Sequence, residues 1–223
     1  MGPQYITPIF IVMHYTAGYT FKGDVNTLSK TLAQGGRDGA SAHVNVGKAG
    51  EVAQIVPFNR KAWHAGPSEI EIDGHVYTNL NINSIGIEIT NQGYLMPIRE
   101  VGGRNLYQDY AGNQIWGDGT FKNGRRQIES APDTWLQTRE VHPVIGKPNL
   151  VWEPFYEPQL DAVEGIVIAL IQKYPTIKYI VSHEQIDTRG WKSDPGPAFP
   201  MRRFTKLTES RADDGDEPIA EAV

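Results

Sequence analysis

The side chains best suited to chemistry lie close together near the end of the chain, in residues 181–199. There, His183 is followed by Lys192 and Asp194, so that an imidazole, an ammonium and a carboxylate fall within twelve residues. Imidazoles and carboxylates bind metal ions, and all three groups can move protons or stabilise charge during a reaction. The sequence Pro-Gly-Pro at residues 195–197 predicts a rigid turn directly after them, because each proline fixes its own backbone.

A second histidine, His14, follows an apolar run at residues 9–13 that is typical of a strand buried on both faces. His183 follows a similar run at residues 177–181. If these two strands are neighbours in one sheet, both imidazoles leave the sheet at the same edge. The alternative interpretation of His14 is a core histidine bonded to a backbone carbonyl.

Two histidines and one carboxylate, with a fourth position open for water, form a common catalytic zinc site. Here the set would consist of His14, His183 and Asp194. The same side chains could bind non-haem iron. They lack the compact His-x-Asp/Glu spacing often found in iron sites, which favours zinc. The chain contains no cysteine, so no thiolate can take part.

Glu88 and Lys192 are the candidates for catalytic groups beside such a metal. Residues 84–90 alternate between isoleucines on one strand face and polar residues or Gly86 on the other, where Glu88 lies. Gly86 would leave that face open to a ligand, although a solvated strand face would also explain Glu88. Zinc lowers the pKa of its bound water from ~16 to about 7. Glu88 could take the remaining proton and Lys192 could stabilise an oxyanion, which predicts metal-assisted hydrolysis of an acyl bond.

Several further segments must position these residues. Residues 157–173 predict an amphipathic helix with a proline in its first turn. Residues 41–46 and 51–56 predict a β-hairpin, and residues 24–33 predict a shorter helix that a glycine pair ends. Together with the buried strands, these elements indicate an α/β fold in which a central mixed β-sheet is flanked by helices.

The domain organisation follows from length and composition. Residues 1–207 predict a single catalytic domain. Residues 94–156 are rich in turn-forming residues and predict an inserted subregion of irregular segments and short strands or hairpins, for example at residues 114–116. Their apolar periodicity is too weak to predict a core of their own. Residues 208–223 are acidic and poor in large apolar side chains, which predicts a disordered tail.

The bulk properties exclude several classes of protein. The net charge of −5 provides no basic surface, so nucleic acid is not expected as a partner. The first residues lack a basic segment and a long apolar core, so we expect no signal peptide. No window approaches the ~18 apolar residues that span a bilayer. We therefore expect a soluble, cytoplasmic protein without membrane insertion.

The residues that carry a resemblance to a known family occur in seven stretches. They are Ser-Ala-His at 41–43, Val-Pro-Phe at 56–58, Ala-Trp-His-Ala-Gly at 62–66, Asn-Ser-Ile-Gly-Ile-Glu at 83–88, Lys-Tyr-Pro at 173–175, His183, and Lys-Ser-Asp-Pro-Gly-Pro-Ala-Phe at 192–199. With these the chain resembles the zinc-dependent N-acetylmuramoyl-L-alanine amidases of the Amidase_2 type. That family includes AmpD-like enzymes, amidases similar to phage T7 lysozyme, and peptidoglycan recognition proteins. The match covers about residues 9–93 and 157–204, and the AmpD-like branch is the most similar.

The resemblance implies a site and a reaction. It implies a zinc ion (Zn2+) held by His14, His183 and Asp194, with Glu88 as the catalytic glutamate and Lys192 as the catalytic lysine. The implied reaction is hydrolysis of the amide between the lactyl group of N-acetylmuramic acid and L-alanine. Peptidoglycan or a muropeptide would be the substrate, and we expect a monomer.

The resemblance also assigns positions in the cleft. Trp63, His64 and Asn83 match positions that contact substrate. His43 lies in a matching stretch too, but its apolar neighbours favour a structural role. Asp194 follows the AmpD-like pattern, whereas some phage members use cysteine as the third ligand. Residues 94–156 are longer than in a compact member, and His142 could shape the cleft or only pack the insertion.

Three alternatives stay open at this point. A relative that binds peptidoglycan without cutting it would be expected to lose a zinc ligand, yet all three are present. A zinc peptidase that cuts within the stem peptide would use the same chemistry. Finally, a recycling enzyme acting on anhydro-muramyl fragments and a phage endolysin that a holin releases to the cell wall both fit the sequence.

Overall fold

The computed structural model describes the chain except for residues 1–3, 19–28, 31–32, 35–38, 125–126 and 214–223, and except for the side chains of residues 210–213. Among the described residues, no helix is both long and apolar enough to cross a membrane.

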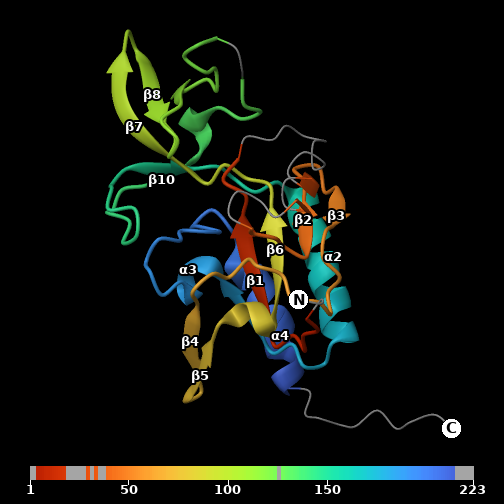
Figure 1. Cartoon of the computed structure of the whole chain (residues 1–223). Coiled ribbons are helices and arrows are strands. Elements are labelled where there is room, and N and C mark those ends of the chain that lie inside the picture. The colour runs from red at the N-terminus through yellow and green to blue at the C-terminus, as the bar shows by residue number, and fades with distance from the viewer. Residues whose placement is uncertain (1–3, 19–28, 31–32, 35–38, 125–126, 214–223) are drawn as a thin grey trace, which may run out of the picture.

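A five-stranded mixed sheet forms the centre of the molecule, in the order β12-β1-β6-β2-β3 (Figure 1). Strand β1 (Phe10–Tyr15) lies between β12 (Tyr179–Ser182) and β6 (Ser84–Ile89), and it is parallel to both. Strand β2 (Val44–Val46) is parallel to β6, and β3 (Val52–Gln54) returns antiparallel to β2. The expected mixed α/β sheet is confirmed, as is the hairpin predicted around residues 47–50.

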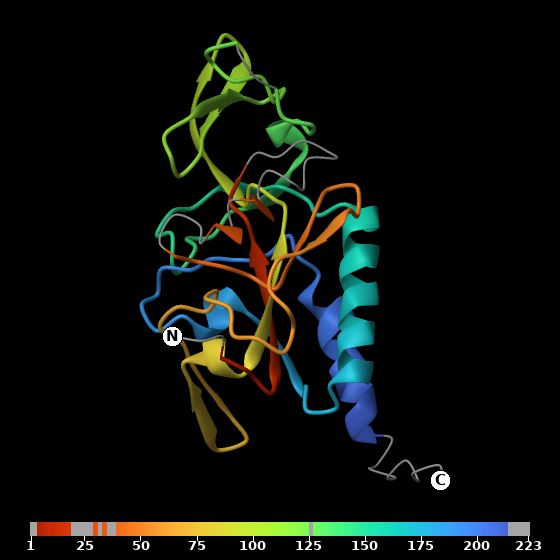
Figure 2. The ribbon, with the colours of Figure 1, turned by 45° about the vertical axis from the view of Figure 1, so that its right-hand side comes forward.

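Two helices, α2 (Glu157–Lys173) and α4 (Met201–Asp213), cover one face of this sheet and lie side by side in Figure 2. The main core fills the space between helices and sheet. It contains the odd-numbered side chains of β1 and β6 together with one stripe of α2, including Ile11, Met13, Ile85, Ile87, Ile89, Leu160, Val163, Val167 and Phe204. Each such side chain contributes about 1.5–3 kcal/mol by leaving water, so this face holds the strands in place.

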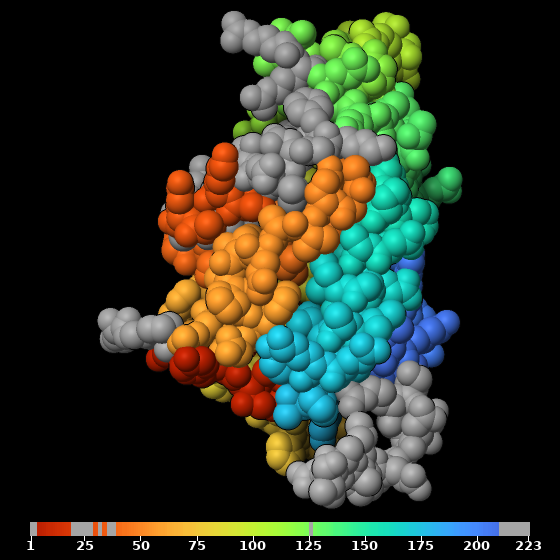
Figure 3. Space-filling model, turned by 90° about the vertical axis from the view of Figure 1, so that its right-hand side faces the viewer, coloured from red at the N-terminus to blue at the C-terminus, as the bar shows by residue number. Residues whose placement is uncertain are grey.

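Helix α2 also packs against the β2–β3 hairpin, whose orange atoms adjoin the helix in Figure 3. The hairpin turn is close to the first turn of the helix. A Cβ atom on Gly50 would lie 2.6 Å from the carbonyl oxygen of Pro158, and Gly50 has a φ of 86°. Glycine is therefore required at this turn for both its conformation and its close approach.

The opposite face of the sheet carries a smaller core. Here α3 (His183–Ile186), the 3-10 helix η1 (Leu80–Ile82) and the hairpin β4 (Glu69–Ile72) and β5 (His75–Thr78) pack against the sheet. The core side chains include Phe10, Val12, Leu80, Val181 and Ile186. The β4–β5 hairpin is not among the predicted elements. Its Asp-Gly turn, with φ of 52° and 75°, is a strong hairpin signal that could have identified it.

The insertion forms a second five-stranded sheet, in the order β10-β11-β7-β8-β9. Its strands are β7 (Tyr94–Val101), β8 (Arg104–Gln108), β9 (Gln114–Trp116), β10 (Leu136–Thr138) and β11 (Leu150–Trp152). The predicted short strands are thus present, including the one at residues 114–116. This region stands beyond the ends of β1 and β6 (Figure 1).

The expectation that the insertion lacks a core of its own is wrong. Seven buried apolar side chains form a separate cluster there: Leu95, Tyr107, Ile115, Phe121, Ile128, Trp135 and Val151. Most strands and loops supply only one of them. The cluster therefore produces no periodic apolar pattern in the sequence, although it is contiguous in space.

A buried polar network joins the root of the insertion to the central sheet. The Lys48 ammonium lies 2.5 Å from Oε1 of Glu153, and both side chains are almost fully buried. The other oxygen of Glu153 accepts the backbone N–H of Gln92, while the Asn91 amide donates to the Glu153 and Pro154 carbonyls. Because its side chains are buried, this network fixes where the insertion leaves and rejoins the central sheet.

Two further predictions concern the C-terminal tail and the helix expected at residues 24–33. Helix α4 continues to Asp213, so the expectation of a disordered tail from residue 208 is wrong for residues 208–213. The reason is that α4 buries Phe204 in the core and packs Leu207 against it, which supports the helix turns that follow. The rest of that segment, residues 214–223, lies outside the described residues, as does most of the helix predicted at residues 24–33.

Candidate metal centre and active-site cleft

Three neighbouring strands bring the candidate residues to one edge of the central sheet. His14 and Glu88 are direct partners in the parallel register of β1 and β6. His183 comes immediately after β12, which pairs with the other side of β1. The expectation that both histidines emerge at the same edge is confirmed, because their strands are adjacent and parallel. The site lies on the face of the sheet that α2 and α4 do not cover.

The three expected ligands form a compact, buried triangle. Nδ1 of His14 lies 2.9 Å from Nδ1 of His183, and each nitrogen lies 3.0 Å from Oδ2 of Asp194. All three residues are buried. A tetrahedral zinc ion with bonds of about 2.0–2.1 Å needs ligand atoms roughly 3.3 Å apart, so a shift of a few tenths of an ångström accommodates the ion. The donor set and its geometry therefore fit a zinc ion.

The electrostatics of the triangle favour ligand forms that can bind a cation. Burial, followed by the neighbouring His183, lowers the pKa of His14 to about 4, so its imidazole is neutral at neutral pH. Burial alone would raise the pKa of Asp194. His183 and His14 outweigh it and hold that pKa well below its ordinary range, so the carboxylate stays charged. Neutral imidazole and ionised carboxylate are the forms that coordinate metals.

A chain of hydrogen bonds behind His14 directs its Nδ1 lone pair toward the triangle. The Ser84 hydroxyl donates to the Leu80 carbonyl at 2.5 Å, so its oxygen can accept the Nε2–H of His64 at 3.2 Å. Nδ1 of His64 then accepts the Nε2–H of His14 at 3.0 Å. This order leaves Nδ1 of His14 without a proton and free to coordinate. Such outer-shell partners orient metal ligands and strengthen their binding.

His64 is held in this position by its loop. The side-chain oxygen of Asn81 accepts the backbone N–H groups of both His64 and Ala65, each at 2.9 Å. His64 was expected to contact substrate. The structure places it beside the cleft, but mainly behind His14 as its hydrogen-bond partner. Burial, followed by His14, lowers the pKa of His64 well below 6.5, which keeps its ring neutral for this role.

The space next to Gly86 is occupied by protein and not by a ligand. A Cβ atom on Gly86 would lie 2.4 Å from Cγ of His64. The expectation that Gly86 leaves the strand open to a ligand is therefore wrong. Its lack of a side chain is instead what allows the His64 ring to lie flat enough over β6 to reach His14.

This packing leads to a prediction for Gly86→Ala. The added methyl group must displace the His64 ring and so weaken its hydrogen bond to His14. We expect metal affinity to fall by about 10- to 100-fold, the usual cost of losing an outer-shell partner, as measured by competition with a chelating dye. Gly165→Ala is the matched control, because a Cβ atom there meets no neighbour. Unchanged affinity in Gly86→Ala would show that His64 does not support His14.

Glu88 faces the same cleft as the ligands and is partly exposed. Its Oε2 atom is buried and has no hydrogen-bond partner among the described residues. Burial, followed by the charge of Asp194, raises the pKa of Glu88 to about 8. A cation bound by the triangle would lower this pKa again, because it stabilises the nearby carboxylate.

Lys192 also lines the cleft, on the loop between α3 and Asp194. That loop is organised by Asp187, whose Oδ2 accepts the backbone N–H groups of Trp191 at 2.7 Å and Lys192 at 3.2 Å. At its far end, the Ser193 hydroxyl is 2.8 Å from the hydroxyl of Tyr15. Asp187 is not among the site residues predicted from the sequence.

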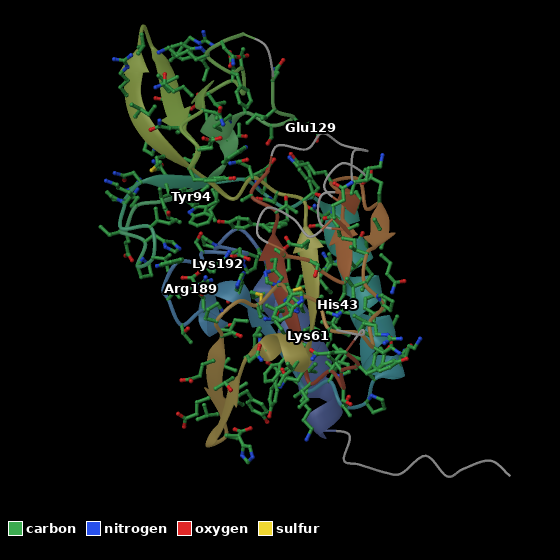
Figure 4. All side chains as sticks on the ribbon, in the orientation of Figure 1. His43, Lys61, Tyr94, Glu129, Arg189 and Lys192 are labelled. Carbon is green, nitrogen blue, oxygen red and sulfur yellow. The ribbon has the colours of Figure 1, made fainter. Side chains whose placement is uncertain are left out.

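The cleft has a volume of about 480 Å³. The three ligands, Glu88, His64 and Lys192 line it, and so do five larger aromatic side chains: Tyr15, Trp63, Tyr94, Tyr110 and Trp191. Tyr94 and Tyr110 belong to the insertion, which therefore forms part of the wall. Figure 4 shows Tyr94 above Lys192. Trp63, which was expected to contact substrate, is 56% exposed and is tied to Ser41 by two hydrogen bonds.

Other predicted positions lie elsewhere. Asn83 is at the amino end of β6, whereas Glu88 is at the carboxyl end, so the structure does not bring Asn83 to the cleft. His43 accepts the Gly86 N–H at Nδ1 and donates from Nε2 to the Arg60 carbonyl, which matches the structural role favoured for it. His142 packs on Trp152 and borders a larger hollow of about 1250 Å³ beside β12 that contains none of the three ligands.

The fold and the site together define a class of protein. A mixed sheet that carries a buried His–His–Asp triangle at its edge, with a carboxylate and an ammonium in the same cleft, is the arrangement of a hydrolase with a metal site.

Comparison with known proteins then identifies the family. The profile of the N-acetylmuramoyl-L-alanine amidase family matches residues 4–197, and the chain belongs to this family of enzymes. No curated protein matches the sequence.

Several solved structures share the fold. A crystal structure of an AmpD derivative has a TM-score of 0.52 at 24% identity, with 90% of this chain and 84% of AmpD covered. AmpDh3 from Pseudomonas aeruginosa, in complex with an anhydromuramic pentapeptide, has a TM-score of 0.55 at 22% identity, with 99% and 72% covered. AmiD from E. coli, in complex with its substrate anhydro-N-acetylmuramic acid-L-Ala-D-γ-Glu-L-Lys, has a TM-score of 0.54 at 22% identity, with 99% and 68% covered.

Proposed function

We propose that this protein hydrolyses the amide bond between N-acetylmuramic acid and L-alanine in peptidoglycan or in muropeptides, with zinc as its metal. The observation that carries the proposal is the buried triangle of His14, His183 and Asp194 in a cleft that also contains Glu88 and Lys192. The muropeptides bound by AmpDh3 and AmiD support the choice of substrate. A zinc ion held by the triangle would lower the pKa of a water molecule and polarise the carbonyl group that the water attacks.

The residues of the chain then have separate tasks. Glu88 accepts a proton from the attacking water and later delivers a proton to the amine of L-alanine as the carbon–nitrogen bond breaks. Lys192 donates a hydrogen bond to the carbonyl oxygen as that oxygen becomes negatively charged. His64, Ser84 and Asn81 hold His14 in its orientation. The three ligands are buried, and electrostatic interactions are stronger in such a low-dielectric environment than in water.

The stem peptide proposed as substrate begins L-Ala-D-γ-Glu. Because this glutamate is linked through its side-chain carboxyl group, its α-carboxylate stays free. That negative charge lies on the residue next to L-alanine, roughly 7 Å from the scissile bond at about 3.3–3.6 Å per extended residue. The cleft must therefore accept a charged peptide as well as a sugar.

Product analysis tests the proposed reaction. The protein is incubated with a purified muropeptide and the products are identified by mass spectrometry. We expect a free muramic acid lactyl group and a peptide that begins with L-alanine. Cleavage inside the peptide would instead establish the zinc peptidase, and binding without cleavage would establish a non-catalytic module. Comparing intact sacculi with soluble anhydro-muropeptide separates an endolysin from a recycling enzyme.

Replacing Lys192 with methionine keeps the length of the side chain but removes its charge. We expect kcat to fall by roughly 10- to 100-fold and KM to change much less, because a charge-assisted hydrogen bond to a developing oxyanion acts mainly in the transition state. Lys178→Met, just before the amino end of β12 and beside the larger hollow, is the matched control. A rise in KM without loss of kcat would assign Lys192 to substrate binding.

A further inference from the structure

Arg189 has an environment that fixes the direction of its guanidinium group. Its Nε donates to Oδ1 of Asp187 at 2.9 Å, and the Asp187 side chain is 1% exposed. The guanidinium lies 4.8 Å from the ring centre of Trp191, which is a cation–π distance. Two contacts on opposite parts of the group thus hold a side chain that would otherwise lose much entropy on binding a ligand.

The two terminal nitrogens of this guanidinium are free to bind a ligand. Nη1 and Nη2 of Arg189 make no hydrogen bond or ion pair with any residue that the structure describes. Nη2 lies over Gly66, and a Cβ atom on Gly66 would come within 3.1 Å of this nitrogen. The absence of a side chain at Gly66 therefore leaves room for the guanidinium. A guanidinium with one nitrogen anchored and two free presents the fork that binds a carboxylate through two parallel hydrogen bonds.

Arg189 lines a hollow that continues the active-site cleft. The hollow has a volume of about 550 Å³, and Trp63, His64, His183 and Lys192 line both it and the cleft. Figure 4 shows Arg189 next to Lys192 on the same side of the sheet. Arg189 and Lys192 are the charged groups that line the hollow in the described part of the chain, and no aspartate or glutamate of that part lines it. The compartment is therefore positive and shares a wall with the metal triangle.

We propose that Arg189 is a specificity-determining residue that binds the free α-carboxylate of the γ-linked glutamate in the stem peptide. This proposal rests on the proposed function. The muramic acid then lies on the side of the cleft that the insertion borders, and the peptide runs past the metal triangle into the positive hollow. Asp187 acts as a positioning residue, because it orients Arg189 and the backbone of Lys192 together.

Two soluble substrates that differ only in this carboxylate provide the test. One contains D-glutamate, and the other contains D-isoglutamine, whose α-carboxyl group is an amide. We expect the wild-type enzyme to cleave the acid with a kcat/KM about 10- to 100-fold higher than the amide, because the charge-assisted pair is lost in the amide. In Arg189→Met this preference should disappear through a rise in KM for the acid alone, and Arg189→Lys should retain part of it.

Arg104→Met is the matched control. Arg104 also pairs with an aspartate, Asp118, and also lies over a tryptophan ring, that of Trp116, but it is on the far part of the insertion. We expect this variant to keep the wild-type preference. Equal cleavage of both substrates by the wild-type enzyme would overturn the proposal, and so would an equal loss for both substrates in Arg189→Met.

A binding measurement separates this proposal from the proposed function. Calorimetry with the peptides L-Ala-D-γ-Glu-L-Lys and L-Ala-D-γ-Gln-L-Lys, in which the second α-carboxyl group is an amide, requires no hydrolysis. Cleavage of neither substrate by the wild-type enzyme would overturn the amidase function. In that case, tighter binding of the acid peptide that depends on Arg189 would still support the carboxylate site. Equal affinity for both peptides would overturn the site as well.

Discussion

Removal of the metal by a chelator is expected to abolish amide hydrolysis, and added zinc is expected to restore it. The physical reason is that His14, His183 and Asp194 point three ligand atoms at a common centre within 2.9–3.0 Å of one another. Neither Glu88 nor Lys192 can substitute for the metal ion there, since a water molecule keeps a pKa near ~16 without the metal. Metal analysis should find one zinc per chain, and activity should follow zinc content.

Metal removal should also lower the melting temperature. A ligand that binds only the folded state at 1,000 times its Kd stabilises that state by about 4 kcal/mol, which corresponds to roughly 10 °C in a chain of this size. His14→Ala should lose both activity and the stabilisation by zinc, whereas His75→Ala, on exposed strand β5, should keep both. Full activity in metal-free protein would contradict the site. Restoration by ferrous iron but not by zinc would contradict the choice of metal.

Much of the central fold could be predicted because three buried strands leave a strong local signal. The apolar runs that became β1 and β12, and the alternating run that became β6, are each short and uninterrupted. Their order in the sheet is not encoded locally. It depends on which strands share a core with α2 and α4, and that is a property of the assembled chain.

The insertion could not be predicted to the same degree. Its core draws single side chains from strands and loops spread over residues 95–151, so no window of the sequence shows its periodicity. The contribution of the insertion to the cleft could not be predicted from the sequence either. Tyr94 reaches the cleft because the Lys48–Glu153 network fixes the root of the insertion, and that network joins residues 105 positions apart.

The chemical groups of the site could be predicted by type, but their supporting contacts could not. His14, His183, Asp194, Glu88 and Lys192 all line one cleft, as their residue types and order indicated. The relay through Ser84, the loop anchor Asn81 and the turn cap Asp187 depend on hydrogen bonds between distant segments. Asn83 shows that a matching stretch does not by itself place a residue in the cleft. It belongs to such a stretch, yet it lies at the amino end of β6, whereas Glu88 lies at the carboxyl end.

Glu88→Gln is the substitution expected to reduce turnover most while leaving the metal site intact. Glutamine has nearly the same shape as glutamate but cannot accept a proton at neutral pH. General acid–base catalysis contributes about 100- to 10,000-fold, so we expect kcat to fall by a factor in that range. Glu88 makes no hydrogen bond with any of the three ligands in the described structure, so zinc content should stay at the wild-type value. Steady-state kinetics and metal analysis on the same preparation check both expectations.

The melting temperature of Glu88→Gln distinguishes a loss of turnover from a folding defect. Oε2 of Glu88 is buried without a partner among the described residues, and a buried polar group without a hydrogen-bond partner costs free energy. Replacing it with a neutral amide should therefore leave the melting temperature equal to or higher than that of the wild type, as expected for a residue kept for catalysis at the expense of stability. Glu69→Gln, at an exposed position of β4, is the matched control for loss of a carboxylate. Wild-type turnover in Glu88→Gln would remove Glu88 as the general base, and loss of zinc from that variant would reassign it to the metal site.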